Sequence, residues 1–304
     1  MSEEPRIAFG DADLPALFGA ADGAAIVGQR SFLGQTKLQL AMLLIGAAAG
    51  VSVQVFDIAE LAYVGVAAYI TLVVMRVNLK LTSMDRVWYE NRLIAESVRS
   101  LAWRYAVGGA PFGLEAPADD DSDPNDADAV LRERISGLLG DVSHVPLPDP
   151  AKGTEQITRP MRELREEPLE VRRRIYDDHR LTGQLIWYAD KAKVNARRQA
   201  RIDTVFVVAS GSAVFFGLLQ ALGRIDVNLL GLAGMLAAVV TTWAATNKFS
   251  DQARGYSMAA HQLTLARTII EHQRSEPAWA AFVNDAEDAI AREHTSWRVA
   301  RAQK

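Results

Sequence analysis

The stretch IGAAAGVSVQVFDIAELAYVG, residues 45–65, joins two apolar runs at a turn whose only charges are Asp57 and Glu60. The first run, Leu38–Phe56, holds 19 residues without a charge, and the second, Leu61–Met75, holds 15. A helix needs about 20 apolar residues to cross a bilayer. These lengths predict a membrane hairpin that turns at 57–60. The alternative is a buried helical hairpin in a soluble protein, although such helices rarely run this long without a charge.

A second pair of uncharged windows follows later in the chain. Thr204–Gly223 holds 20 residues and Val227–Asn247 holds 21, with Arg224 and Asp226 in the short turn between them. The predicted fold is therefore an all-α membrane protein with two tandem transmembrane hairpins, four spans in all. Long helices outside the spans are expected to form a helical bundle.

The basic residues predict the orientation of the spans. They flank the outer ends of both hairpins: Arg30, Lys37, Arg76, Lys80, Arg86, Lys191, Lys193, Arg197, Arg198, Arg201, Lys248 and Arg254. Because cytoplasmic flanks carry the excess of Lys and Arg, both termini and the middle of the chain should lie in the cytoplasm, with the spans in the inner membrane. The N-terminal segment lacks the basic and apolar regions of a secretory signal peptide. The net charge of −4 gives no indication of a nucleic-acid partner.

Small and polar residues inside the spans suggest two kinds of contact. Small residues let helices approach closely in lipid, either within a hairpin or between protomers, and the candidates are Gly46, Gly50, Gly231 and Gly234. Polar residues either bond to their own helix or line an aqueous path, and the candidates for pore lining are Ser52, Gln54, Thr71, Ser210, Ser212, Thr241 and Thr242. No span carries a charge near its centre, which argues against a proton-coupled pump or a voltage sensor.

Outside the spans, the apolar pattern predicts further helices. Apolar residues recur at heptad spacing over 84–105, where Asn91 is the polar member of the seam, and again over 256–270. A helical pattern runs from Pro168 into the third span with Gly183 as its only weak point. A final amphipathic helix is expected over about 277–301.

Composition divides the chain into three parts. Residues 1–112 form a first two-span domain that ends at the stop signal GGAP. Residues 113–156 form an acidic and proline-rich linker with a possible short helix at 127–139. Residues 157–304 form a second two-span domain with the same layout, entering the membrane from the same side, which does not suit an inverted-repeat transporter.

The sequence offers no set of residues typical of catalysis. There is no cysteine, which excludes thiol chemistry and cysteine-ligated metals. The five histidines are scattered, and no metal spacing, phosphate-binding glycine loop or nucleophile elbow occurs. We therefore expect a protein that is not an enzyme and that needs no cofactor.

Several strings resemble the tandem form of the SLATT family, bacterial two-span membrane domains named for their association with SMODS and SLOG proteins. They cover nearly the whole chain: DADLPALFGAADGAAIVGQ at 11–29, RLIAESVRSLAWRYAVGGAPF at 92–112, QITRPMRELREEPLEVRRRIYDDHRLTGQLIWYADKA at 156–192 and AEDAIAREHTSWR at 286–298. The resemblance implies a membrane effector of bacterial conflict and antiphage systems. A protein partner linked to a nucleotide signal would trigger it, and it would breach the membrane.

The resemblance also marks residues outside the spans, although the family supplies no catalytic residue to transfer. The residues that match residue types recurring in the family are Glu96, Trp103, Arg104, Arg180, Gln184, Trp187, Tyr188, Glu293, His294 and Trp297. The four from Arg180 to Tyr188 either form a regulated contact or pack against the 92–105 helix, and the second is favoured. Arg104 and Glu96 are compatible with an ion pair on the surface of one helix.

Two functions fit these observations. In the first, several protomers gather around small faces, turn polar residues toward a shared lumen, and stay closed until the cytoplasmic helices rearrange. In the second, the spans only anchor a helical scaffold or sensor that recruits a cytoplasmic partner. A conducting pore needs a polar stripe or a gate of apolar rings. The stripe here is thin, since it consists of hydroxyls and Gln54 without a charged ring.

Overall fold

A computed structural model describes residues 9–82, 84–114, 126–141 and 155–302, with the backbone alone for 79–82, 126, 141 and 292–302. Every element in these ranges is a helix, so the all-α prediction is confirmed. The chain divides into two compact units. The span unit comprises Gln29–Asp85 and Ala192–Arg254, and the head unit comprises Met1–Gly28, Arg86–Lys191 and Gly255–Lys304.

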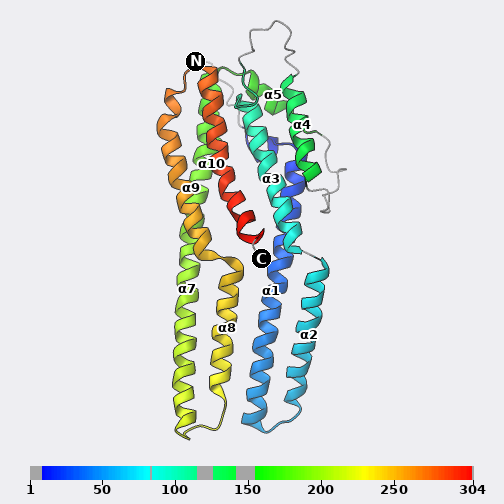
Figure 1. Cartoon of the computed structure of the whole chain (residues 1–304), viewed down its shortest axis with the longest axis vertical. Helices are drawn as coiled ribbons and strands as arrows, with labels where there is room; N and C mark the ends of the chain where they lie inside the picture. The colour runs from blue at the N-terminus through cyan, green and yellow to red at the C-terminus, as the bar shows by residue number, and fades with distance from the viewer. Residues whose placement is uncertain (1–8, 83, 115–125, 142–154, 303–304) are drawn as a thin grey trace, which may run out of the picture. The chain divides into compact units, whose positions relative to one another are not determined.

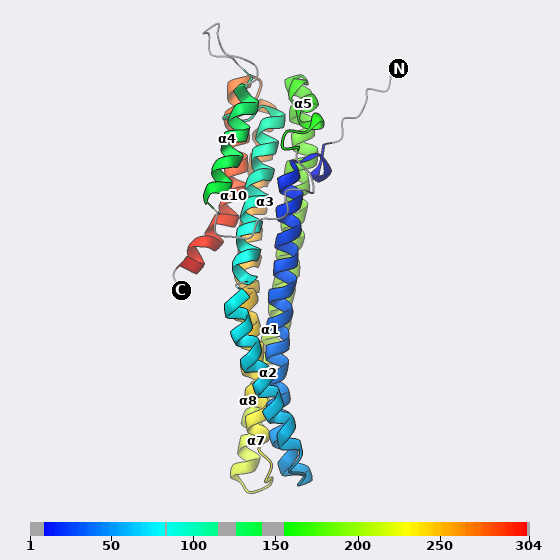
Figure 2. The ribbon, with the colours of Figure 1, turned by 90° about the vertical axis from the view of Figure 1, so that its right-hand side faces the viewer.

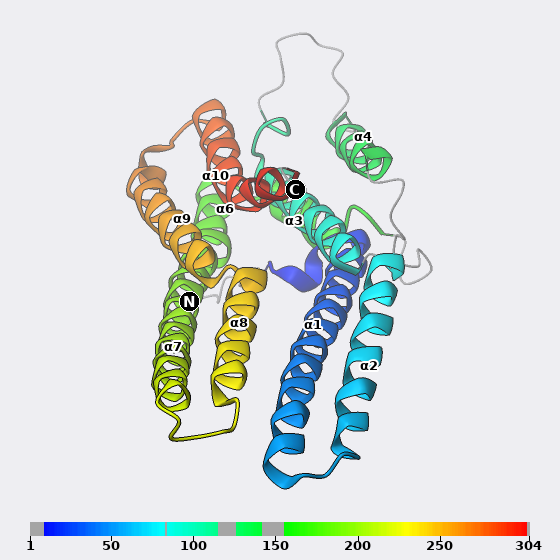
Figure 3. The ribbon, with the colours of Figure 1, turned by 60° about the horizontal axis from the view of Figure 1, so that its bottom comes forward.

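The span unit contains two helical hairpins. Its helices are α1 (Ala16–Phe56) with α2 (Leu61–Thr82), and α7 (Thr182–Ala221) with α8 (Leu229–Asn247), where the first parts of α1 and α7 belong to the head unit. Each pair runs side by side in Figure 1, and Figure 3 shows both turns at the same end of the unit. All four helices are long and apolar enough to cross a membrane, which confirms the predicted spans.

Local chemistry explains where these hairpins turn. A residue with a positive φ readily ends a helix. One such residue follows α1, Asp57 with a φ of 53°, and another follows α7, Gly223 with a φ of 67°. The side chain of Asn228 accepts a hydrogen bond from the Gly231 amide at 2.9 Å and so caps α8. The second hairpin is close-packed near this cap, because a Cβ at Gly217 would lie 3.3 Å from Leu230 Cδ1.

The head unit is a bundle of helices. Besides parts of α1 and α7, it contains most of α3 (Met84–Val107) and of α9 (Phe249–Ile269), whose first residues belong to the span unit. Its other elements are η1 (Asp11–Asp13), α4 (Asp126–Asp141), α5 (Arg159–Glu166), α6 (Leu169–Ile175), η3 (Tyr176–Leu181), η4 (Ile270–His272) and α10 (Glu276–Ala302). Figure 2 shows α3, α4 and α10 side by side within this unit. The structure confirms the helices expected at 127–139 and 277–301, and it adds α5, which the sequence pattern did not predict.

A chain of aromatic rings runs through the core of the head unit. Phe9 meets Trp103 of α3 at 4.8 Å between ring centroids, and Trp103 meets Tyr176 at 5.9 Å. Tyr176 then meets Trp279 of α10 at 5.6 Å. All three contacts are edge-on, the geometry that aromatic quadrupoles favour. Burial of these large rings joins the N-terminal segment, α3, η3 and α10 into one core.

The helix that leads into the third span is continuous from Leu169 to Ala221, as its pattern predicted. It departs from α geometry at η3, a π-helical stretch, and not at the predicted weak point, Gly183. The wider π turn places Tyr176, Arg180 and Leu181 together on the buried side. Such turns are frequent at functional sites, which directs attention to Arg180.

Candidate functional site

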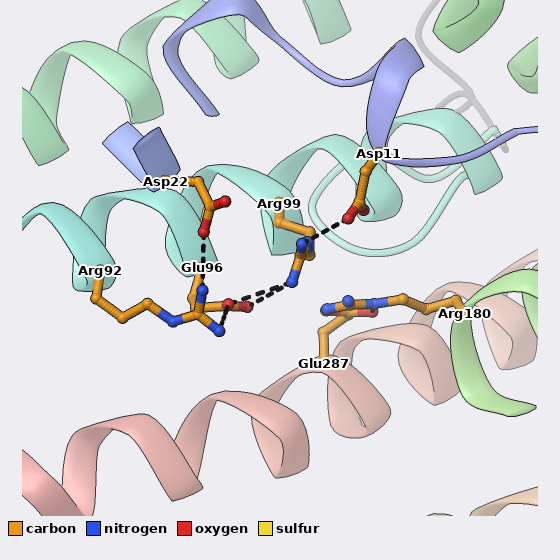
Figure 4. A network of polar contacts seen from close by, with 7 residues as sticks. All are labelled: Asp11, Asp22, Arg92, Glu96, Arg99, Arg180 and Glu287. Carbon is orange, nitrogen blue, oxygen red and sulfur yellow. Dashed lines mark hydrogen bonds and ion pairs between the residues drawn. The ribbon is translucent and has the colours of Figure 1, made fainter. Parts of the chain in front are cut away.

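The centre of the head unit holds a buried ion pair between Arg180 of η3 and Glu287 of α10 (Figure 4). Arg180 Nε donates to Glu287 Oε1 at 2.8 Å and Nη2 donates to Oε2 at 2.7 Å, so the contact is bidentate. The hydroxyl of Tyr176 donates to the same Oε1 at 3.0 Å. Arg180 is 3 % exposed and Glu287 is fully buried. Two helices distant in sequence are therefore joined by charge inside an apolar core.

Amphipathic geometry turns Glu287 inward. Val283 precedes it by four residues and Ile290 follows by three, and both are buried in the same core cluster. Residues at these spacings share one face of a helix. A carboxylate on the apolar face of α10 must therefore find a cationic partner in the core or bear a large desolvation cost. This pattern is the sequence signal for Glu287, which was not among the residues predicted from the sequence.

A second carboxylate, Glu96 of α3, sits between two arginines of its own helix (Figure 4). Arg92 Nη2 lies 2.5 Å from Glu96 Oε1, and Arg99 Nη1 lies 3.2 Å from it. Arg92 also donates to Asp22 of α1 at 2.9 Å, and Arg99 donates to Asp11 of η1 at 2.8 Å. Glu96 is 6 % exposed, so these arginines neutralise it while they fasten the N-terminal segment to α3.

Burial and charge set the protonation of the central pair. Burial lowers the pKa of Arg180, but the attraction of Glu287 and its hydrogen bonds, with smaller contributions from Tyr176 and Glu96, outweigh burial and raise that pKa. Burial also raises the pKa of Tyr176 well above its usual value, and the Glu287 carboxylate adds to this increase. Arg180 therefore stays charged and Tyr176 stays neutral near pH 7. Displacement of α10, and not titration of these two groups, would break the contact.

Further polar contacts hold α10 in place. Arg104 of α3 donates to Asn284 at 2.7 Å and to Asp288 at 2.6 Å. Arg172 of α6 is 1 % exposed, donates to the Val107 carbonyl at 2.7 Å, and also pairs with Glu276.

The Val107 carbonyl accepts a further hydrogen bond from the Trp279 indole at 2.7 Å. Together with the central pair, these contacts form a polar latch, which we define as Arg104, Arg172, Arg180 and their partners on α10. The latch is suited to holding a helix, and none of its contacts joins a nucleophile to a base.

Four of the ten residues marked by the family resemblance lie in or beside this latch. Trp103 is in the aromatic core, and Glu96, Arg104 and Arg180 carry the charges described above. The expected surface position of the Arg104 and Glu96 pair was wrong. Glu96 is buried and pairs with Arg92 and Arg99, while Arg104 reaches α10, because the interior of the bundle offers partners that local spacing does not reveal.

Two of the residues that follow Arg180 contact α9, and the packing of this group against the 92–105 helix stays a prediction. Trp187 meets Tyr256 of α9 at 5.3 Å between ring centroids, and Tyr188 stacks on the same ring at 5.8 Å. Gln184 is half-buried. The side chains of Glu293, His294 and Trp297 lie outside the described residues.

The candidate residues of the span unit are dispersed. The hydroxyls of Ser52, Thr71, Thr241 and Thr242 each donate to the carbonyl four residues earlier on the same helix, at 2.8–2.9 Å. Gln54 Oε1 accepts from the Asn228 amide at 3.3 Å and links the two hairpins near their turns. Ser210 and Ser212 are partly exposed. A pore-lining role for these residues stays a prediction.

The four glycines differ in their surroundings. A Cβ at Gly46 would lie 2.9 Å from Tyr69 Cε2, so Gly46 lets α1 and α2 approach closely. At Gly231 the neighbour is Asn228, the residue that caps the same helix. A Cβ at Gly50 or Gly234 would have no atom within 4 Å. Contacts of these two residues with another protomer stay a prediction.

The chain matches two related family models. Residues 15–173 match the model described as SMODS and SLOG-associating 2TM effector domain 3, and residues 176–297 match effector domain 1 of the same series. Neither a comparison with curated proteins nor a comparison with solved structures gave a match. The predicted division at 1–112, 113–156 and 157–304 stays a prediction. Because the first match alone covers more than half of the chain, the protein belongs to the SLATT family and carries two SLATT effector domains in tandem.

Proposed function

We propose that this protein is an effector of the bacterial inner membrane that oligomerises and forms or gates a pore in a conflict or antiphage response. Its family consists of two-TM effector domains associated with SMODS and SLOG proteins. The basic flanks of the hairpins support an orientation with both termini in the cytoplasm. The head unit would then receive the trigger on the cytoplasmic side.

The latch on α10 is the observation that carries this proposal. Arg180 stands on the helix that continues without a break to Ala221, the end of the third span. Its bidentate bond to Glu287 connects α10 directly to that helix. Release of α10 would leave Arg180 charged in an apolar core, which is costly, so the helix must rearrange. In this proposal the ion pair is the contact that the trigger breaks, and the helix then shifts from a closed to a released state.

The surface of the span unit supports oligomerisation. In each of the four apolar windows only 11–17 % of the residues are buried within the chain. Gly50 and Gly234 offer small, unoccupied positions on α1 and α8 where another helix could approach. A second copy of the chain is the partner that fits these faces.

The trigger is proposed to come from another protein. The family association favours a partner linked to a nucleotide signal, which would bind the head unit and displace α10. We propose no catalytic step and no cofactor for this chain, because its sequence lacks the motifs of the common enzyme classes.

One observation favours a second candidate, a non-conducting scaffold. Four of the six hydroxyls expected to line a pore donate to carbonyls of their own helices. Such bonds reduce the polar character that a water-filled lumen requires. In this function the spans anchor the head unit, and release of α10 exposes a binding surface without any change in conductance.

Membrane potential in bacteria, read with a potential-sensitive dye after induced expression, separates the two candidates. The test variant is Glu287→Gln, which breaks the latch, and the control is Glu163→Gln, which removes the acid of an exposed pair with Arg159 on α5. A pore gated by the latch predicts collapse of the potential with Glu287→Gln alone. A steady potential in all three strains, with equal amounts of protein in the membrane, would support the scaffold.

A further inference from the structure

The span unit contains an apolar groove where α1, α7 and α8 meet. Its volume is about 360 Å³, and its walls include Leu44 of α1, Val205 of α7 and Val239 of α8. Lys37 of α1 and Arg201 of α7 also line it. The groove therefore combines apolar walls with two cationic side chains.

The two cations mark the level of the membrane surface. Lys37 directly precedes the uncharged window Leu38–Phe56, and Arg201 stands three residues before the window Thr204–Gly223. Trp243, which also lines the groove, lies near the end of the fourth span. Tryptophan and basic residues are enriched where a span leaves the bilayer core. The groove thus lies at the end of the spans where the headgroup region meets the hydrocarbon.

Nothing in the described part of the chain neutralises these two charges. Lys37 Nζ lies 5.5 Å from the centroid of the Trp243 ring, a cation–π contact that holds the ammonium at the groove. Among the residues that the structure describes, no carboxylate forms an ion pair with Lys37 or Arg201. Asp203, two residues beyond Arg201, accepts a hydrogen bond from Gln199. The groove is thus left with two cations for an external anion.

We propose that this groove binds one anionic phospholipid, with an acyl chain along its apolar walls and the phosphate between Lys37 and Arg201. Charge complementarity selects an anionic headgroup, because each basic side chain near such a surface gains about 1 kcal/mol. The apolar walls select a lipid over a soluble anion, because a free phosphate would leave them exposed. The bound lipid would contact both hairpins and so hold the span unit together, whether or not the spans conduct.

Native mass spectrometry of the full chain in a mild detergent tests this site. The protein would be titrated with dioleoyl phosphatidylglycerol, with the zwitterionic dioleoyl phosphatidylcholine, and with inorganic phosphate. The test variant is Lys37→Gln with Arg201→Gln. The matched control is Arg76→Gln with Arg197→Gln, which removes two exposed charges that do not line the groove.

We expect the intact protein and the control to prefer phosphatidylglycerol, and the test variant to lose about fivefold in its binding for each charge removed, the equivalent of about 1 kcal/mol. Ala41→Phe, which fills the groove and keeps both charges, should reduce the binding of both lipids. An equal loss in the control would overturn the site in favour of diffuse surface charge. Unchanged binding by Ala41→Phe, or equal competition by inorganic phosphate, would overturn the lipid assignment.

Discussion

Glu287→Gln is the substitution whose effect follows most directly from the structure. It keeps the size of the side chain and removes its charge, so Arg180 loses a bidentate partner at 2.8 and 2.7 Å. The new amide group is a donor, and it faces a guanidinium that can only donate. Breaking a buried ion pair costs about 3–5 kcal/mol. Because one oxygen remains as an acceptor, we expect about 3 kcal/mol.

The loss is measurable as a shift of the melting temperature of the head unit. For a unit of roughly 150–250 residues, each kcal/mol shifts Tm by about 2–4 °C, so Glu287→Gln should lower Tm by about 6–12 °C. Tryptophan fluorescence of the purified protein is a suitable signal, since Trp103 and Trp279 are buried in the core of this unit. The control Glu163→Gln, in an exposed pair, should cost no more than about 1 kcal/mol.

A double variant tests the reasoning behind this value. Arg180→Met combined with Glu287→Met replaces the pair by apolar side chains, which is often neutral or stabilising for a buried pair. The double variant should therefore be more stable than Glu287→Gln alone, with a coupling of more than 1 kcal/mol between the two sites. The account is refuted if Glu287→Gln melts within 2 °C of the unmodified protein, or if the double variant loses the sum of both single effects.

Three further predictions concern other contacts. Gly46→Leu should destabilise the first hairpin by about 1–3 kcal/mol, because the leucine side chain must displace the Tyr69 ring. A melting temperature equal to that of the unmodified protein would contradict this close approach. Gly50→Leu should leave the hairpin intact and weaken the oligomer seen by cross-linking in detergent, so an unchanged oligomer excludes this face. Burial and a hydrogen bond to Asp128 raise the pKa of Tyr105 from 10.0 to about 12. The neutral phenol therefore stabilises the head unit below about pH 10, and this contribution is lost as the pH rises toward 12. Melting temperatures from pH 9 to 12 should fall less steeply for Tyr105→Phe, and equal slopes would contradict the assignment.

The spans were predictable because a bilayer imposes a simple rule on sequence. A segment that crosses it must be long and nearly free of charge. Accordingly, α1 ends at Phe56 with the first apolar window, and α2 begins at Leu61 with the second. The other boundaries followed different chemistry. The second helix continues to Thr82, beyond the window that ends at Met75, because charged residues end an apolar run but not a helix. The helix of the fourth span, α8, begins at Leu229, directly after its capping residue Asn228.

The latch could not be predicted in the same way. Arg180 and Glu287 are 107 positions apart, and no local period connects them. The sequence marked Arg180 through a family resemblance, but it did not identify its partner. The π turn that orients Arg180 has no signature in the pattern from Pro168 onward, which reads as ordinary helix. The available clue was the Glu287 carboxylate between apolar residues of the last helix, at the spacing that shares their face.

Ion flux through proteoliposomes made with the purified protein is the most direct test of the central claim, that release of α10 opens a path through the spans. Vesicles holding a potassium gradient would carry the unmodified protein, Glu287→Gln or Glu163→Gln, with insertion verified for each. The account predicts rapid loss of the gradient with Glu287→Gln and slow loss with the other two. Gradients that persist equally in all three preparations would contradict a pore held closed by the Arg180–Glu287 pair.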